Sequence, residues 1–114
     1  MSVPRKPNLG DLEMLVLVAL IRLAPNAYGV AVREEIERRA GRSLSIGALY
    51  TTLSRLEEKG LVTSHLGEAT AERGGRAKKF YQVTAAGQSH LERSLSAVYR
   101  MAEGTKLWPA AKKT

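Results

Sequence analysis

The segment around the middle of the chain restricts the fold more than any other feature of the sequence. Ser45 is a favourable helix N-cap, and Leu44 before it is placed to pack against Leu49, the fourth helical residue. Gly60 is a typical C-terminal stop, which predicts a helix that ends near Lys59. The rest of the fold has to accommodate this helix.

The predicted helix has two faces of different chemistry. Leu49, Leu53 and Leu56 recur at helical spacing and form the stripe that faces the core. The opposite face carries short or hydrogen-bonding side chains with one aromatic ring and one cation, namely Gly47, Ala48, Tyr50, Thr51, Ser54 and Arg55. A surface helix usually carries glutamate and lysine there. We therefore predict that another molecule lies against this face.

Periodicity and boundary residues predict the remaining elements. They are a first helix capped by Asn8 and ending near Leu23, a second helix from about Tyr28 to Ala40 stopped by Gly41, strands at about residues 61–66 and 79–83, and a last helix after Thr84. The first helix is apolar almost all round, which predicts a central position or a place in a subunit interface.

Three helices, a two-stranded hairpin and one further helix, in that order, predict a mainly α (α+β) fold of the winged helix-turn-helix type. The connection between the second and third helices, residues 41–44, is short and contains glycine, as expected of a helix-turn-helix. Such a module suits duplex DNA, because one α-helix fits the major groove while basic side chains on the wing reach the phosphates.

Length and charge narrow the function. The chain has 114 residues, no cysteine and a formal net charge of +7. This length predicts one domain and is too short for a two-domain enzyme. The lack of cysteine excludes disulfides and favours the cytoplasm, and the longest apolar run, residues 14–21, is too short for a membrane span. The positive charge favours nucleic acid or another anionic partner.

The sequence contains few residues that could form a catalytic site. His65 and His90 are the two histidines, and neither has a carboxylate or a nucleophile at a recognisable spacing. Without cysteine or clustered acids they make no convincing metal site. We expect no enzyme activity, no metal and no cofactor.

Two stretches of the chain resemble the PadR-type transcriptional regulators. Residues 45–62 read SIGALYTTLSRLEEKGLV, and residues 76–87 read RAKKFYQVTAAG. Residues 12–23, followed by Tyr28 and Gly29, resemble the family's first helix and the junction after it. The resemblance covers about residues 9–88. It implies a cytoplasmic homodimeric repressor whose C-terminal helix pairs two subunits, and whose operator DNA is released when a small molecule binds or conditions change. Because the sequence stops soon after one C-terminal helix, it resembles the short subgroup.

The matched positions and their chemistry predict the DNA-binding residues. On the third helix and in the hairpin these are Ser45, Gly47, Tyr50, Thr51, Ser54, Arg55, Arg73, Arg76, Lys78 and Lys79. Alternatives stay open for several of them. Tyr50 could pack against the wing, Thr51 and Ser54 could only keep the surface soluble, and Arg55 could pair with Glu58. The four hairpin cations could belong to a solvated loop.

The last helix carries an apolar stripe that a monomer this small would leave partly exposed, which predicts a homodimer. The predicted dimerisation residues are Leu12, Leu15, Leu91, Leu95, Val98 and Ala102. The alternative is that the stripe packs along the first helix of its own subunit. Tyr99 and Trp108 are predicted to bind a planar aromatic effector, and the alternative for Trp108 is an interface anchor or a surface residue.

These predictions divide the chain into four parts. They are a flexible N-terminal arm over residues 1–8, the winged helix-turn-helix over residues 9–83, a dimerisation helix over residues 84–108 and a basic frayed tail over residues 109–114. The predicted function is a sequence-specific transcriptional regulator, a homodimeric repressor of an inverted-repeat operator. The alternative is a winged-helix module that binds nucleic acid without sequence preference or binds a protein.

Overall fold

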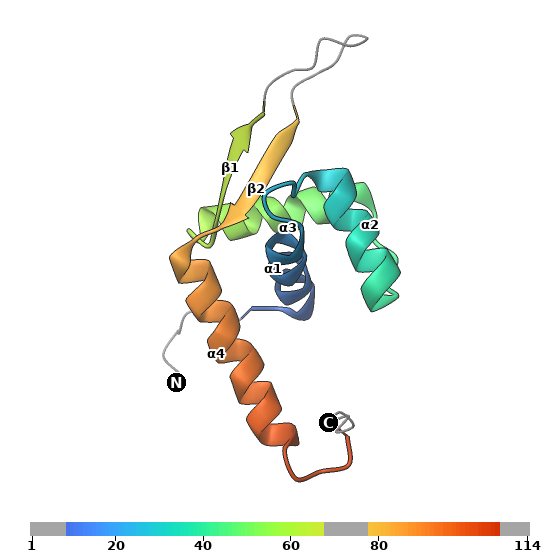
Figure 1. The fold of residues 1–114 in the computed structure, drawn as a ribbon, viewed down its shortest axis with the longest axis vertical. Coiled ribbons are helices and arrows are strands. Elements are labelled where there is room, and N and C mark those ends of the chain that lie inside the picture. The colour runs from blue at the N-terminus through green and yellow to red at the C-terminus, as the bar shows by residue number, and fades with distance from the viewer. Residues whose placement is uncertain (1–8, 68–77, 108–114) are drawn as a thin grey trace, which may run out of the picture.

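The computed structural model describes residues 9–67 and 78–107 of the chain (Figure 1). Its elements are α1 (Asp11–Leu23), α2 (Gly29–Ala40), α3 (Ile46–Glu58), β1 (Val62–Leu66), β2 (Lys79–Val83) and α4 (Ala85–Ala102). The type and order of these elements confirm the sequence prediction, and most boundaries differ by one or two residues. The exception is α4, which ends at Ala102, whereas the prediction extends the last helix to residue 108. The predicted arm, most of the wing tip and the predicted tail lie outside the described residues.

The start of α1 differs from the prediction. Gly10, and not Asn8, is the N-cap, and the Gly10 N–H donates to Glu13 Oε1 at 3.0 Å. Asp11 and Glu13 place two carboxylates in the first turn, where the helix dipole favours negative charge. The side chain of Glu13, three residues after the cap, therefore accepts from the free N–H at the start of the helix, a role that the prediction gives to the side chain of Asn8.

The helix-turn-helix forms where its boundary residues predict it. Gly41 ends α2 in the left-handed conformation with a φ of 65°, which glycine adopts at little cost. Ser45 begins α3, since its Oγ accepts a hydrogen bond from the Ala48 N–H at 3.0 Å. Leu44 between them is buried. Both of these boundaries confirm the sequence prediction.

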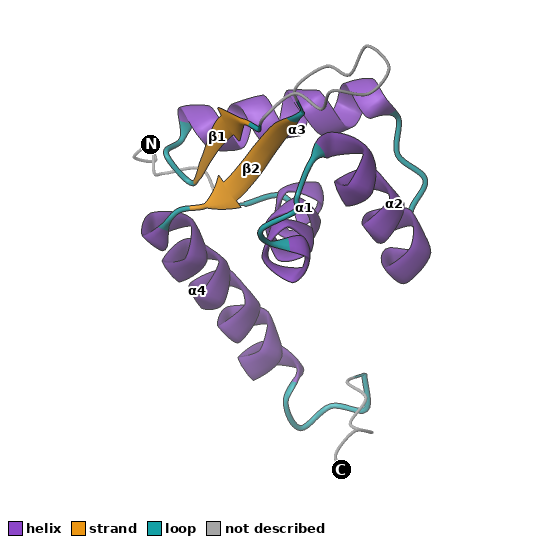
Figure 2. Cartoon of the chain, turned by 45° about the horizontal axis from the view of Figure 1, so that its top comes forward, coloured by secondary structure: helices purple, strands orange, loops and turns teal. Residues whose placement is uncertain are grey.

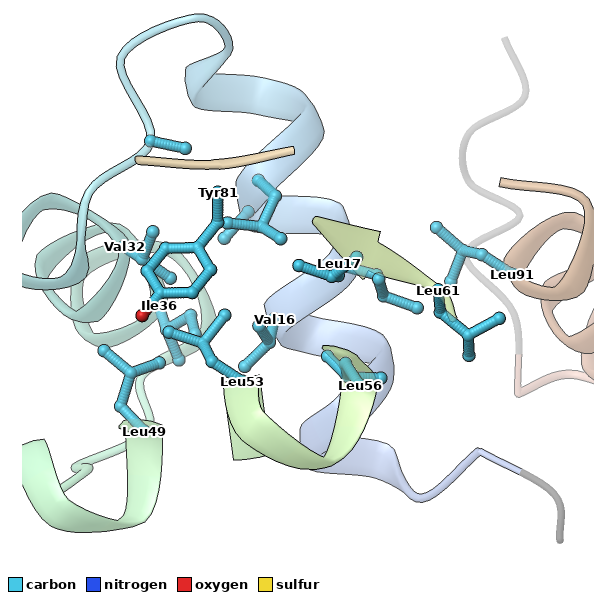
Figure 3. Packing of buried hydrophobic residues seen from close by; sticks show 14 of the residues in the cluster. Val16, Leu17, Val32, Ile36, Leu49, Leu53, Leu56, Leu61, Tyr81 and Leu91 are labelled. Carbon is cyan, nitrogen blue, oxygen red and sulfur yellow. The ribbon is translucent and has the colours of Figure 1, made fainter. Parts of the chain in front are cut away.

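The wing is an antiparallel hairpin in which Val62 pairs with Val83 and Leu66 with Lys79. It is joined to the helical body by a backbone hydrogen bond from the Tyr81 N–H to the Ala27 carbonyl oxygen at 2.9 Å. The Tyr81 side chain points into the core (Figure 3). The middle of β2 is therefore anchored to the segment that directly precedes α2.

The core lies where α1 meets α2, α3 and the hairpin (Figure 3). Val16 and Leu17 of α1 are fully buried, as are Leu49 and Leu53 of α3, so α1 is central as predicted. The predicted inward stripe of α3 is confirmed by this packing. Removing one such leucine would cost about 2 to 5 kcal/mol, which means that the outer face of α3 rests on a well-fixed support.

The hairpin and α4 leave the body in opposite directions along the long axis of the molecule (Figure 1). Thr84 caps α4 by accepting a hydrogen bond from the Gly87 N–H at 3.0 Å, which confirms its predicted role. The first turns of α4 pack against the body, whereas the following turns lead away from it (Figures 1 and 2). Among the described residues, no helix combines the length and the apolar character that a membrane crossing requires.

Glu35 of α2 is nearly buried and forms ion pairs with three arginines. Arg22 of α1 donates from Nε at 2.9 Å, Arg39 lies at 3.0 Å, and Arg38 also pairs with the carboxylate. The Arg22 hydrogen bond holds the pKa of the Glu35 carboxyl below its ordinary value of 4.5; burial acts in the opposite direction, and the Arg38 and Arg39 charges lower the pKa further. The cluster ties α2 to the end of α1.

We expect Glu35→Gln to lower the melting temperature at pH 7. Because the pKa of Glu35 is lower in the folded chain than in the unfolded chain, its carboxylate stabilises the fold above pH 4.5, and this contribution is lost as the pH falls toward the folded-state pKa. The wild-type and variant melting temperatures should therefore converge in acid, while Glu34→Gln, at an exposed position of the same helix, serves as the control. A difference that stays constant from pH 7 to pH 3 would contradict this role.

Candidate nucleic-acid interface

The outer face of α3 is open to solvent along its length. Every residue predicted to bind DNA from this helix is exposed, namely Ser45, Gly47, Tyr50, Thr51, Ser54 and Arg55. Thr52 points the other way, since its buried hydroxyl donates to the Ala48 carbonyl oxygen at 2.8 Å. The exposed side chains therefore form one continuous strip, to which hydroxyl groups and a guanidinium contribute.

Tyr50 lies against the beginning of α2 while its side chain stays 41% exposed. Its hydroxyl oxygen lies so close to Gly29 that a Cβ atom added at Gly29 would be 2.0 Å from it. The alternative that Tyr50 packs within its own chain is therefore realised in part. Its ring contacts α2, and it also lies near Tyr81 of the wing. Gly29 is a packing contact of Tyr50 that the sequence prediction missed, because only the tertiary approach of α3 to α2 brings the tyrosine there.

Arg55 makes no ion pair within the described part of the chain, so the predicted alternative of a pair with Glu58 is not found there. Its charge acts on the nearby Glu13 carboxylate. Its exposed guanidinium remains available to an external acceptor, and five N–H donors make arginine suited to guanine edges or phosphate.

Lys59 fixes the C-terminal end of α3 to α1. Its Nζ atom lies 2.9 Å from Oε2 and 3.1 Å from Oε1 of the nearly buried Glu13. Burial alone would raise the pKa of the Glu13 carboxyl, but the hydrogen bond from Gly10 and the contact with Lys59 outweigh it, and the net pKa is lowered. This pair holds α3 in place below its exposed strip.

The described part of the wing presents two exposed lysines. Lys78 Nζ lies 4.2 Å from the centroid of the Tyr28 ring, and Lys79 Nζ lies 5.7 Å from that of Tyr81. These are cation–π contacts, which orient a flexible lysine. Arg73 and Arg76, the other two predicted wing cations, lie outside the described residues.

Three aromatic side chains meet where the wing leaves the body. The rings of Tyr28 and Phe80 are 5.7 Å apart in an edge-to-face arrangement, and His65 stacks on Phe80 at 5.7 Å. We call Tyr28, His65 and Phe80 the wing-base cluster. The sequence prediction missed it, although alternation along β2 places Phe80 on the face opposite Tyr81.

The apolar stripe of α4 is only partly available to a second subunit. Leu91 is 3% exposed and belongs to the core of the single chain, so it leaves little surface for a partner. Leu95 and Val98 are 46% and 56% exposed, and Met101 beyond them is exposed as well. The intrasubunit alternative therefore holds for the beginning of the helix, and the open stripe starts one turn later.

The other residues predicted for the dimer interface and for the effector site stay predictions. Leu12, Leu15 and Ala102 are half-buried, so each retains surface that a partner could cover. Tyr99 is 48% exposed, and Trp108 lies outside the described residues. Within the described residues no group of three metal-ligating side chains occurs.

Comparison with known proteins places the chain in a family. The model of the transcriptional regulator PadR-like family matches residues 16–93. A PadR-like transcription factor from Bacteroides fragilis is 25% identical, with a TM-score of 0.68 over 82% of this chain and 85% of that chain. A PadR family transcriptional regulator from Eggerthella lenta is 26% identical, with a TM-score of 0.64 over 82% and 81% of the two chains.

A curated relative has a less informative name. It is an uncharacterized 37.1 kDa protein in transposon Tn4556 of Streptomyces fradiae, 38% identical over 91 residues. The match covers 80% of this chain and 24% of that protein, so this chain spans about a quarter of the length of its relative. This match shows that the two proteins share a related segment, and the name of the relative gives no activity.

The family match covers more than half of the chain, and the similar structures superpose on most of it. The predicted resemblance and the winged helix-turn-helix fold are thereby confirmed. Members of this family are regulators of transcription, which also agrees with the expectation that the chain is not an enzyme. The chain belongs to the PadR-like family of transcriptional regulators.

Proposed function

We propose that this regulator is a sequence-specific DNA-binding repressor that acts in the cytoplasm as a homodimer on an inverted-repeat operator. The observation that carries the proposal is the exposed strip of α3, which combines hydroxyls on a rigid support with a guanidinium that makes no ion pair among the described residues. A helix with such a face fits the major groove, where each base pair shows a distinct pattern of donors and acceptors. Repression is relieved, in this proposal, by a small molecule.

The division of labour follows from the chemistry of the two surfaces. On α3, Thr51, Ser54 and Arg55 offer short or forked donors that can reach base edges. In the wing, the cations attract phosphates without needing one geometry, so they add affinity for any sequence. Specificity would come from the helix and most of the salt dependence from the wing.

Replacing Arg73 and Arg76 together with alanine should weaken binding to every duplex and make its salt dependence shallower. The slope of log affinity against log salt should fall by about 0.9 for each lost phosphate contact. Fluorescence anisotropy titrations over a range of salt concentrations measure both quantities. The matched control is Arg93→Ala with Arg100→Ala, which removes two exposed arginines from α4 instead. Equal slopes for the wild type and the wing variant would refute the wing's role.

The homodimer rests on the second half of α4. Leu95, Val98 and Met101 are large apolar side chains that the single chain leaves exposed on a helix leading away from the body (Figure 2). Such a surface needs a partner in water. A two-fold symmetric pair of α4 helices places two copies of α3 for half-sites about one helical turn, or a multiple of it, apart.

Introducing a charge on this stripe should prevent pairing. We expect the wild type to scatter light as a dimer at micromolar concentration and Leu95→Glu with Val98→Glu to scatter as a monomer, because a buried unpaired carboxylate is strongly unfavourable. Ser96→Glu adds a charge to an exposed position of the same helix and should leave the dimer intact. A monomeric wild type would remove the dimer and, with it, the inverted repeat.

A second candidate function is a winged-helix module that binds nucleic acid without sequence preference or binds a protein. The four wing cations are the observation that favours nucleic acid over other partners. Steep salt dependence with the same affinity for every duplex would support this candidate over the repressor.

A further inference from the structure

We propose that Phe80 and Tyr28 are positioning residues that aim the wing at the DNA backbone. The inference rests on the proposed DNA binding and adds to it the device that fixes the direction of the wing. It concerns the junction between the hairpin and the body, where the wing-base cluster lies.

The hairpin cannot fix its own direction. Its two strands have five residues each, and an isolated two-stranded hairpin is marginally stable in water. Tyr81 anchors the middle of β2 through its buried ring and its hydrogen bond to Ala27. On β1, Val62 is buried at the base of the hairpin, and Ser64 Oγ donates a hydrogen bond to Glu57 Oε2 of α3 at 2.8 Å. These contacts hold the half of the hairpin nearest to the body, so the direction of the half nearer to the tip depends on a further contact.

The wing-base cluster supplies that further contact. Phe80 forms an isolated β-bridge with Tyr28, the N-cap residue of α2, and their rings meet at 75° with centroids 5.7 Å apart. Edge-to-face rings at this separation attract each other. His65 of β1 stacks on Phe80 with an angle of 19° between the rings, so both strands take part. The contact therefore joins the hairpin to the beginning of α2.

Gly67 shows how closely the strands close around Phe80. A Cβ atom added at Gly67 would lie 2.6 Å from Phe80 Cε1 and 3.1 Å from Cδ1. The Gly67 N–H also donates to the Lys78 carbonyl oxygen at 2.7 Å, which pairs the chain directly before and after the tip. A larger residue at this position would therefore push the ring of Phe80 out of its present place.

Lys78 links the cluster to a cation of the wing. Its Nζ atom is held over the Tyr28 ring at 4.2 Å, at the start of α2. A lysine fixed in this way loses less conformational freedom when it meets a phosphate. Beyond it the chain enters residues 68–77, which carry Arg73 and Arg76. A tilt at Phe80 would move Lys78 and Lys79 relative to α3.

The test compares Phe80→Ala and Gly67→Ala with Leu66→Ala, a neighbouring wing residue that is 68% exposed and outside the cluster. Binding of a labelled duplex to the full chain is titrated at several salt concentrations, with the active fraction measured each time. We expect both cluster variants to bind about tenfold more weakly at physiological salt, with a slope shallower by about two units because at least two phosphate contacts are lost. Leu66→Ala should match the wild type.

A merely structural role would lower the active fraction and leave the slope of the remaining folded protein unchanged, and this result would overturn the proposal. The proposal would also be overturned if both cluster variants bound DNA with the affinity and the salt dependence of the wild type. Gly67→Ala keeps the Phe80 ring and displaces it, so it remains informative if Phe80→Ala fails to fold. Absence of salt-dependent DNA binding by the wild type would instead refute the proposed function on which the inference rests.

Discussion

Alanine in place of Gly87 should destabilise the fold by about 3 kcal/mol, near the upper end of the usual cost of overpacking. The added Cβ would lie 2.2 Å from the carbonyl oxygen of Leu61 and 2.9 Å from Val83 Cγ1. That carbonyl cannot retreat easily, because it accepts the hydrogen bond from the Thr84 N–H at 3.0 Å. The clash is thus with fixed backbone at the point where α4 joins the wing.

Thermal denaturation followed by circular dichroism measures this effect. For a domain of this size the melting temperature should fall by about 10 °C or more. Gly47→Ala is the matched control, since a Cβ atom there has no neighbour within 4 Å and alanine favours the helix by about 0.5 to 1 kcal/mol. A Gly87→Ala melting temperature within about 2 °C of the wild type would mean that α4 does not pack on Leu61 as described.

Thr51→Ala and Arg55→Ala should each reduce the discrimination between operator and random duplex by about 1 to 3 kcal/mol, or roughly fivefold to 150-fold. Both side chains are exposed on α3, and Arg55 has no ion pair in the described part of the chain that would be lost with it. Their removal should therefore change binding and leave the melting temperature nearly unaltered.

Competition titrations with operator and random duplexes measure the discrimination directly. Glu58→Ala provides the control, because Glu58 is exposed on the last turn of the same helix and is no candidate contact. Equal losses of affinity on both duplexes would show that Thr51 and Arg55 contact phosphates. An unchanged affinity on both would exclude them from the interface.

Local chemistry explains which parts of the fold could be predicted from the sequence. Ser45, Thr84 and Gly41 act within one turn of their own position, so the residue type alone identifies the helix boundary. The prediction of Asn8 as a cap is wrong, because Gly10 and Glu13 cap the same helix two residues later. Sequence spacing does not decide between two adequate caps.

Contacts between elements could not be predicted in this way. Gly29, Gly67 and Gly87 each lie against a side chain or carbonyl from another part of the chain, and a glycine in the sequence does not reveal what approaches it. The outward face of α3 was predictable because it is the complement of a leucine stripe. The direction of the wing was not, because it depends on rings that meet only after folding.

Leu91 shows the same limit on α4. Its helical spacing with Leu95 and Val98 predicts one continuous stripe, and the stripe exists. The position at which α4 leaves the body divides that stripe into a buried part and an exposed part. This division depends on how the first turns of α4 pack on the body, and the spacing of apolar residues in the sequence does not predict that packing.

The claim that this chain reads a DNA sequence is tested most directly by selecting bound fragments. Purified protein is mixed with sheared genomic DNA at near-physiological salt in the presence of excess random competitor, and the retained fragments are sequenced. We predict enrichment of one inverted-repeat motif, with half-sites about one helical turn, or a multiple of it, apart. Retention of fragments with no common motif would contradict the account and leave a basic winged-helix protein that binds without reading sequence.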